Sequence, residues 1–503
     1  MAPCAPASTA PLLNVLLVLY AVYGWLVPGM FHHPGLSWTR VTSAMSVEMA
    51  TGIFSRLPQL ALTLIGSFIL VLSALRAFGC VDSILKGSSQ IAVRSANAIT
   101  IGSATIPAMI GAGMPRVVAA AIETSASLGG QLMPPIMGIS AFLMAEFLGV
   151  SYFDVVARGY APGLIYFVGV AVSVYLLSSR YKYRLDSVTA ETMRWADWTN
   201  LAAFFVVVAG LIGLMAILHV PPMFAALYVF VSVFGAMLVA HLAFIAWARA
   251  GSFRAIVPAL GRFLDSFANI TSDLTLLLAT LSIMTGAFVI TGVPTKIGAL
   301  LLQAAGVNVA AMAIVAFFFG ALLGTGLPPA PTYIITALVI APPMIKVGVD
   351  PWVVHFFAFF LAVWGELTPP TSVSAAVTAK IADASFMQTL FRAITICVSL
   401  FVLMAGVFTR PELVLEPGVA QLGAMLLIMI ATIGITFSIQ ARFADRREID
   451  VPLRLVLAAA ALVVLLHPDR QVALLACVPV GVFVGYWILR RRNAPVVARA
   501  GAG

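Results

Sequence analysis

The sequence predicts an all-α protein that crosses a membrane about 12 times, counted as helices of about 20 apolar residues. Of the 503 residues, 62% are hydrophobic and only 9% are charged, whereas a soluble globular chain carries about 25% charged residues. A water-soluble fold cannot hide so much apolar surface. These numbers exclude soluble enzymes, nucleic-acid-binding proteins and disordered scaffolds, and they make the lipid bilayer the expected surroundings.

Long apolar runs set the predicted spans. Two stretches, 117–148 and 352–378, are interrupted in the middle by Gly and Pro-Pro, and we expect each to be a broken helix. Two further interrupted segments, 88–112 and 307–345, are predicted to be re-entrant hairpins. The uninterrupted runs lie near residues 11–30, 58–78, 160–178, 201–219, 222–247, 272–293, 390–408, 419–438, 452–466 and 471–489.

Basic residues between the runs indicate the orientation, because cytoplasmic loops collect Lys and Arg. Four clusters, within 180–194, 249–262, 442–454 and 490–492, fall on one side of the membrane only if both hairpins return to their side of entry. The first hairpin is then cytoplasmic and the second external, and both chain ends are cytoplasmic. The net charge of +9 therefore needs no nucleic-acid partner.

An internal repeat relates the two halves of the chain. Displacing the sequence by 235 residues places Gly-Gln-Leu-Met-Pro-Pro (130–135) on Gly-Glu-Leu-Thr-Pro-Pro (365–370). The same displacement places the Pro-Ala-Met-Ile of 107–110 on the Pro-Pro-Met-Ile of 342–345. With the predicted orientation the two repeats are inverted in the membrane, which is typical of secondary transporters whose broken helices meet near the midplane.

The broken helices suggest ion chemistry. Each proline removes a donor and frees carbonyl groups, and freed carbonyls with a Thr hydroxyl suit Na⁺, while a half-helix N-terminus suits a carboxylate. Glu366 lies inside the second break at membrane depth, where carboxylates are costly and mark ion paths. It is either a cation or proton ligand, or a carboxylate bonded to freed backbone donors.

At these residues the chain resembles the large, DctM-like membrane subunit of tripartite ATP-independent periplasmic (TRAP) transporters, particularly the type in which the small subunit is fused. The resemblance extends over about residues 11–490 and rests on four motifs taken together. They are Ser-Ala-Asn-Ala-Ile-Thr-Ile-Gly-Ser-Ala-Thr-Ile-Pro (95–107), Ser-Leu-Gly-Gly-Gln-Leu-Met-Pro-Pro-Ile-Met-Gly (127–138), Gly-Thr-Gly-Leu-Pro-Pro-Ala-Pro-Thr-Tyr (324–333) and Leu-Thr-Pro-Pro (367–370).

The resemblance implies a permease of the bacterial inner membrane that imports organic acids, such as C4-dicarboxylate-like carboxylates, together with Na⁺. It also implies a periplasmic substrate-binding protein as a partner, no enzymatic activity, and no cofactor beyond the coupling ion. One Na⁺ site would use Gly324, Gly326, Gly365 and Thr368, and the other would use Ser95, Asn97 and Gly130. Substrate would lie between the hairpin tips, near Ser103 and Thr332.

Two features depart from the family pattern. The segment 79–98 carries Asp82, Lys86 and Arg94 where the family has an apolar hairpin limb. Arg94 either binds a substrate carboxylate bidentately or anchors a shortened segment at the interface. The four-span small subunit is missing from this sequence, so we expect it as a separate partner.

Two alternative hypotheses for the function remain. The chain is either a stand-alone Na⁺/carboxylate symporter or a degenerate, inactive TRAP permease.

The pattern divides the chain into five predicted parts. They are N-terminal scaffold spans (1–78), a first transport repeat (79–178), linking scaffold spans (179–271), a second transport repeat (272–408), and C-terminal spans with a basic tail (409–503).

Two motifs of other membrane proteins do not occur in the sequence. They are the phosphate-binding Gly-rich motif for ATP hydrolysis and the paired Asp-rich motifs of membrane transferases.

Overall fold

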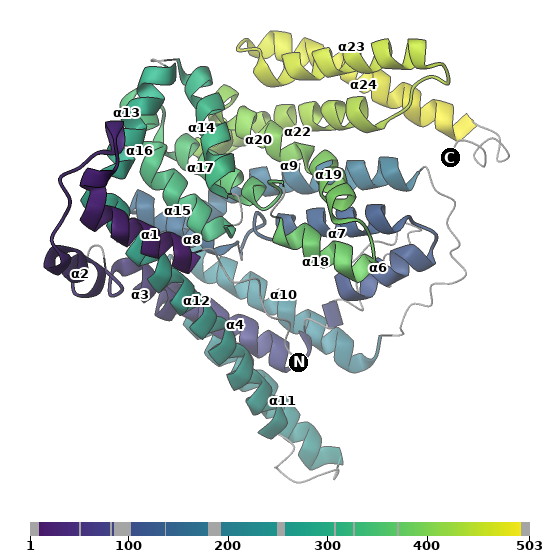
Figure 1. Ribbon diagram of the computed structural model, residues 1–503. Helices are drawn as coiled ribbons and strands as arrows, with labels where there is room; N and C mark the ends of the chain where they lie inside the picture. The colour runs from purple at the N-terminus through teal and green to yellow at the C-terminus, as the bar shows by residue number, and fades with distance from the viewer. Residues whose placement is uncertain are drawn as a thin grey trace.

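The computed structural model describes residues 10–49, 52–80, 83–84, 102–135, 137–179, 193–248, 257–305, 308–324, 327–369 and 372–493. Over these ranges the regular elements are helices, without a strand (Figure 1). The prediction of an all-α polytopic membrane protein is therefore confirmed, while the count of 12 spans stays a prediction.

Eight helices in the described ranges are long and apolar enough to cross a membrane, or nine if the bent pair α19 (Phe386–Ile396) and α20 (Val398–Thr409) is one span. That pair bends by 41° at its junction. The eight are α3–α4 (Arg56–Leu62 and Leu64–Ala77), α9 (Tyr152–Ser178), α10 (Trp195–Ala216), α11 (Pro222–Ala248), α12 (Val257–Thr291), α22 (Val419–Gln440), α23 (Arg447–Leu466) and α24 (Arg470–Asn493).

The predicted breaks appear as pairs of short helices. The first stretch forms α7 (Arg116–Gly129) and α8 (Ile139–Leu148), and the second forms α17 (Pro351–Gly365) and α18 (Val373–Ala382). Adding 235 to the bounds of α7 gives 351 and 364, which match the bounds of α17 within one residue. Adding 235 to the bounds of α8 gives 374 and 383, which match those of α18 within one residue. This agreement supports the internal repeat.

Short helices surround the two broken pairs. The chain enters α7 through α6 (Gly102–Gly111), and it enters α17 through α13 (Val293–Ala305), α14 (Val309–Gly324), α15 (Pro329–Val339) and α16 (Ala341–Lys346). After α20 a single turn, α21 (Glu412–Leu415), leads to α22. The segment predicted as the second hairpin thus begins with two limbs, α14 and α15, that are separated by a few residues.

Helix α17 forms the centre of the core. Its aromatic side chains Phe356, Phe357, Phe359 and Phe360 are all at most 2% exposed, and α17 packs against α14, α15, α20 and α8. A helix that is apolar on all sides and buried on all sides belongs inside a bundle. By contrast, α10, α11, α23 and α24 bury at most 28% of the residues in their apolar windows, as membrane-facing or partner-facing helices do.

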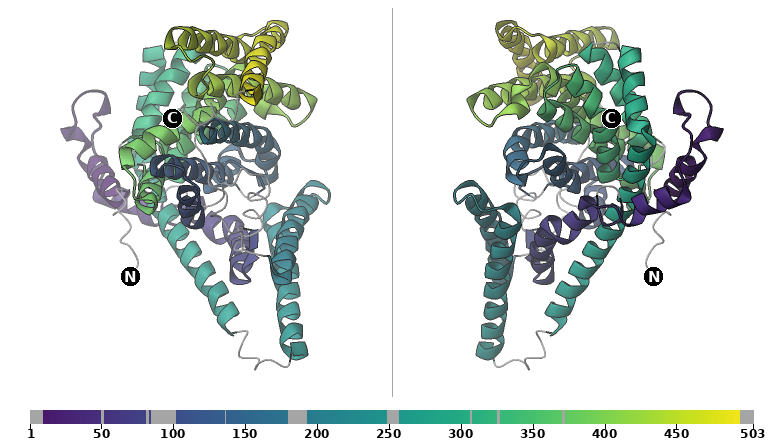
Figure 2. Two further views of the ribbon diagram at one scale, coloured as in Figure 1. Left: turned by 90° about the vertical axis from the view of Figure 1, so that its right-hand side faces the viewer. Right: turned by 90° about the vertical axis from the view of Figure 1, so that its left-hand side faces the viewer.

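Helices α11 and α12 extend beyond the rest of the described chain (Figure 2). Helix α12 has 35 residues, whereas about 20 suffice to cross the hydrocarbon core. The Arg262 side chain, in the second turn of α12, donates to the Ala77 carbonyl at the end of α4. This bond fixes α12 to the end of a neighbouring span.

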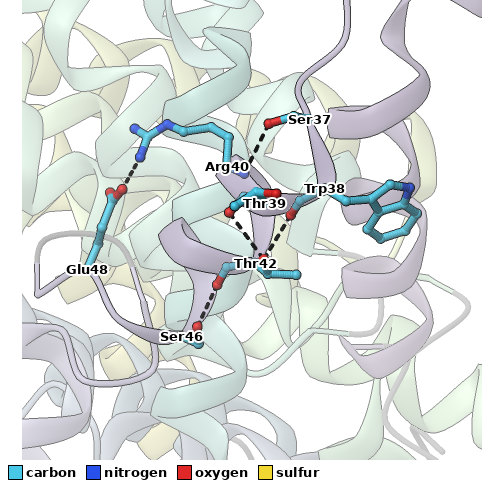
Figure 3. A network of polar contacts seen from close by, with 7 residues as sticks. All are labelled: Ser37, Trp38, Thr39, Arg40, Thr42, Ser46 and Glu48. Carbon is cyan, nitrogen blue, oxygen red and sulfur yellow. Dashed lines mark hydrogen bonds and ion pairs between the residues drawn. The ribbon is translucent and has the colours of Figure 1, made fainter.

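The segment after the first apolar helix, α1 (Ala10–Tyr23), ends in a local network of polar contacts (Figure 3). It passes through the short 3₁₀ turns η1 (Gly24–Leu26) and η2 (Gly29–Phe31) into α2 (Trp38–Ser46). Ser37 caps α2 by accepting from the Arg40 backbone N–H, and Arg40 forms an ion pair with Glu48. These contacts are local, and none includes a predicted site residue.

Candidate functional site: two helix breaks facing each other

The second break brings two predicted ligands together. A Cβ atom built on Gly324, at the end of α14, would lie 3.0 Å from the Gly365 Cα at the end of α17, and 3.2 Å from the Thr332 methyl group. A Cβ built on Gly365 would likewise lie 3.3 Å from the Gly324 Cα, so a side chain at either position would press the two backbones apart. The structure therefore brings Gly365 against Gly324 and Thr332, from which it is distant in the sequence.

The helix ends at this point give the site its polarity. Helices α14 and α17 both end here, and their last carbonyl groups carry partial negative charge. Helices α15 and α18 begin within a few residues of these ends, and their first N–H groups carry partial positive charge. The site can thus favour a cation at one set of helix ends and an anion at the other.

Two threonines line the same region differently. Thr332 is fully buried, and its hydroxyl donates to the Pro328 carbonyl at 3.0 Å, so its methyl group faces the glycine pair. Thr368 lies in the break itself, and its backbone N–H donates to the Gly365 carbonyl at 3.1 Å. Carbonyl and hydroxyl oxygens are ligands that suit a hard cation, so the Gly365 carbonyl and the Thr368 hydroxyl are groups of the kind that Na⁺ requires, whereas Thr332 presents its methyl group.

Glu366 contacts the first break. The Gln131 side-chain N–H and the Ser374 hydroxyl each donate to the same carboxyl oxygen, Oε2, at 3.3 Å. Gln131 is the second residue after α7, and Glu366 is the first after α17. The two breaks therefore touch through side chains.

The two broken helices run antiparallel along each other. Arg116 at the start of α7 forms a 2.5 Å ion pair with Asp383 just past α18, and the Thr124 and Thr378 hydroxyls lie 2.7 Å apart in the buried middle. At the far end, the Phe147 ring of α8 lies against the His355 ring of α17, with ring centroids 6.2 Å apart. As residue numbers rise along one broken helix they fall along the other, which is the arrangement that inverted repeats require.

Helix α9 satisfies the backbone groups that the first break frees. The Tyr152 hydroxyl donates to the Pro135 carbonyl at 2.9 Å and accepts from the Met137 N–H at 3.1 Å. The Tyr166 hydroxyl donates to the Ser125 carbonyl at 2.6 Å. Irregular backbone is tolerated at membrane depth only where such partners exist, so α9 holds the break in place.

The remaining predicted ligands are only partly described. Gly130 directly follows α7, next to Gln131. Ser103 is the second residue of α6, where the structure describes the backbone alone. Arg94, Ser95, Asn97 and Gly326 lie outside the described residues. The first Na⁺ site and the substrate contacts therefore stay predictions.

Several residues of the site did not emerge from the sequence analysis. Thr124, Thr378, Tyr152 and Tyr166 lie on helices whose apolar pattern gives no sign of a polar contact. Gln131 carried a usable signal, because the 235-residue displacement places it on Glu366. In the part of the chain that the structure describes, no group of three or more His, Cys, Asp or Glu side chains could hold a metal ion.

Comparison with known proteins confirms the resemblance. One curated relative is the isethionate TRAP transporter permease protein DctMQ of Oleidesulfovibrio alaskensis, with 28% identity over 306 residues, which are 58% of this chain and 44% of the relative. The chain thus matches less than half of that protein's length. The family model described as "Tripartite ATP-independent periplasmic transporter, DctM component" matches residues 89–413. Since this match covers well over half of the chain, including both breaks, the protein belongs to the DctM family of TRAP transporter membrane components.

Proposed function

We propose that the protein is the permease subunit of a Na⁺-coupled TRAP-type transporter that imports small organic acids across the bacterial inner membrane. Its partners would be a periplasmic binding protein that delivers the substrate and a small four-span membrane subunit. Membership of the DctM family supports a multi-pass transport subunit rather than an enzyme. The observation that carries the ion coupling is the backbone-to-backbone contact of Gly324 and Gly365.

The polarity of the helix ends supports both the coupling to Na⁺ and the transport of an organic acid. Two helix C-termini, those of α14 and α17, meet where a cation is expected, and Thr368 supplies a hydroxyl beside them. The N-termini of α15 and α18 follow closely and suit the negative charge of an organic acid. The curated relative is named for isethionate, which is a small organic anion, so substrates of that charge class fit this chain as well.

Removing the Thr368 hydroxyl tests the Na⁺ site. We expect the wild-type protein in detergent to unfold at a higher temperature as Na⁺ replaces K⁺, because a ligand of the folded state stabilises it. Thr368→Ala should reduce this Na⁺-dependent shift by at least half. The matched control is Thr395→Ala on α19, whose hydroxyl donates to the Arg392 carbonyl in its own helix. Equal Na⁺ shifts in both variants would refute the assignment.

The two alternatives differ from the proposal in their need for partners. A stand-alone Na⁺/carboxylate symporter would take up its substrate in proteoliposomes without a binding protein. A degenerate permease would show neither uptake nor a Na⁺-dependent shift in the unfolding temperature. We expect uptake only when a periplasmic binding protein and the small subunit are both present, with the Na⁺ gradient directed inward.

A further inference from the structure

A cavity of about 280 Å³ opens between α9 and α22. These two helices pack along each other (Figure 1), and both are long and apolar enough to span the membrane. The side chains of Leu164 on α9 and Leu422 on α22 line the cavity and are exposed. Exposed apolar side chains on spanning helices face lipid in a membrane-embedded protein, so the cavity opens toward the bilayer.

The lining of the cavity changes from polar to apolar with depth. The cavity follows α22 from Gly418, which directly precedes the helix, to Met425, a distance of about 10 Å. At the first end the Gln421 side-chain amide donates to carbonyl groups of α9 and α21, and the first N–H groups of α22 have no partner within the helix. At the deeper end lie the thioether side chains of Met133 and Met425. A phospholipid has the same order, with ester groups above an apolar chain.

The floor of the cavity belongs to the first helix break. Met133 lies in the Gly-Gln-Leu-Met-Pro-Pro motif, and its sulfur atom would lie 3.2 Å from a Cβ built on Gly163 of α9. The Leu132 carbonyl oxygen would lie 3.0 Å from the same Cβ. The break therefore rests directly on α9 beside the cavity, and a molecule in the cavity contacts the break through Met133.

Neither water nor a small organic acid suits this space. None of the described residues that line the cavity is charged, so an anion would find no positive side chain there. A buried water molecule needs about two to four polar partners, which the apolar part of the cavity does not offer. An empty cavity would forfeit the dispersion contacts of its walls. An apolar chain restores these contacts, and the bilayer supplies such chains at the opening.

We propose that the cavity binds one acyl chain of a membrane phospholipid. An apolar cavity of about 150 Å³ holds a benzene molecule, so about 280 Å³ accommodates a segment of roughly ten carbon atoms. The bound chain enters between α9 and α22, and it supports the first break by packing against Met133. This site is separate from the Na⁺ site at the glycine pair, and it does not rest on the proposed ion coupling.

The test cross-links lipid to the protein in vesicles of phosphatidylethanolamine and phosphatidylglycerol. A small fraction of the phosphatidylethanolamine carries a photoactivatable diazirine in the middle of one acyl chain. After irradiation the protein is digested, and mass spectrometry identifies the labelled residues. We expect labelling at Met133, Leu164 or Met425 to exceed that on the exposed faces of α23 and α24 by about tenfold, which corresponds to a binding preference of about 1.4 kcal/mol.

Two variants close the cavity from different sides. Leu422→Trp enlarges a side chain at the opening, and Ala161→Phe enlarges a buried one that lines the cavity. Each should reduce the labelling of Met133 and Met425 to the level of the exposed helices. The matched control is Leu474→Trp near the start of α24, because Leu474 is 54% exposed, as against 51% for Leu422, and does not line the cavity. This control should keep the wild-type labelling.

A second measurement separates a filled cavity from a damaged fold. Delipidated wild-type protein in detergent should unfold at a higher temperature as phosphatidylethanolamine is added, because the lipid binds the folded state. Without lipid, Ala161→Phe should unfold at a higher temperature than the wild type, since its ring fills the void, and it should gain less from added lipid. If Ala161→Phe does not fold, Leu422→Trp at the exposed opening decides the test.

The inference is overturned if Met133 and Met425 label no more strongly than the exposed helices, or if the closed variants label like the wild type. Labelling that disappears when the small membrane subunit is co-purified would assign the cavity to a protein helix and would overturn the inference as well. None of these measurements uses Na⁺ or a transport substrate. A failure of the proposed Na⁺ coupling therefore leaves the acyl-chain site standing, and the reverse also holds.

Discussion

Replacing Gly324 by valine is expected to abolish the Na⁺-dependent stabilisation and to destabilise the folded protein by about 3 kcal/mol. A Cβ at this position would already lie 3.0 Å from the Gly365 Cα, which is tighter than most Cβ contacts in folded proteins. The two branches of valine would lie closer still and would force the ends of α14 and α17 apart. Overpacking of this kind costs typically 1–3 kcal/mol, occasionally more.

The control for this substitution is Gly213→Val on α10, where a built Cβ meets no atom within 4 Å. Both variants place the same side chain in an apolar helix, so they differ only in the contact that they disturb. The unfolding temperature in detergent, with Na⁺ and with K⁺, measures both effects. If Gly324→Val unfolds like Gly213→Val and keeps its Na⁺ shift, the close approach of α14 and α17 is not required.

Replacing Tyr152 by phenylalanine is expected to destabilise the protein by about 2–3 kcal/mol. The change keeps the ring, which stacks on Phe142 at 3.9 Å, and removes the hydroxyl that bonds to Pro135 and Met137 in the first break. A buried carbonyl and a buried N–H then lose their partner, and each such group costs about 1–3 kcal/mol.

The matched control is Tyr160→Phe on the same helix. Tyr160 is 36% exposed, so removing its hydroxyl should leave no buried backbone group without a hydrogen-bond partner. The unfolding temperature and the rate of proteolysis within the break should change in Tyr152→Phe and remain near the wild type in Tyr160→Phe. Equal behaviour of the two variants would show that the break does not depend on α9.

The sequence predicted the helix breaks well because their cause is local. Glycine and proline destabilise a helix through their own backbone chemistry, and both stretches combine Gly with Pro-Pro in their middle. For this reason 117–148 and 352–378 could be recognised as broken helices without a structure. The structure places α7 and α8, and α17 and α18, within a few residues of these bounds. The same local chemistry made the displacement of 235 residues visible, and with it the equivalence of Gln131 and Glu366.

Run lengths were predicted less well. The first apolar run, 11–30, becomes a helix of 14 residues followed by two 3₁₀ turns. The run 272–293 begins inside a helix of 35 residues that ends at Thr291. Hydropathy reports where lipid or core can surround a segment, whereas helix ends depend on caps and on contacts such as the Arg262 bond to Ala77. These contacts come from distant parts of the chain.

By itself, the sequence determined that this protein is helical and membrane-embedded, that its helices break at two related motifs, and that it resembles the TRAP permeases. Composition and local backbone chemistry suffice for these conclusions, because they act within a few residues. Only the tertiary structure decided that Gly324 meets Gly365, that Gln131 meets Glu366, and that Tyr152 and Tyr166 support the first break. Such contacts depend on how whole helices pack, and an apolar helix surface does not specify which neighbour it will meet.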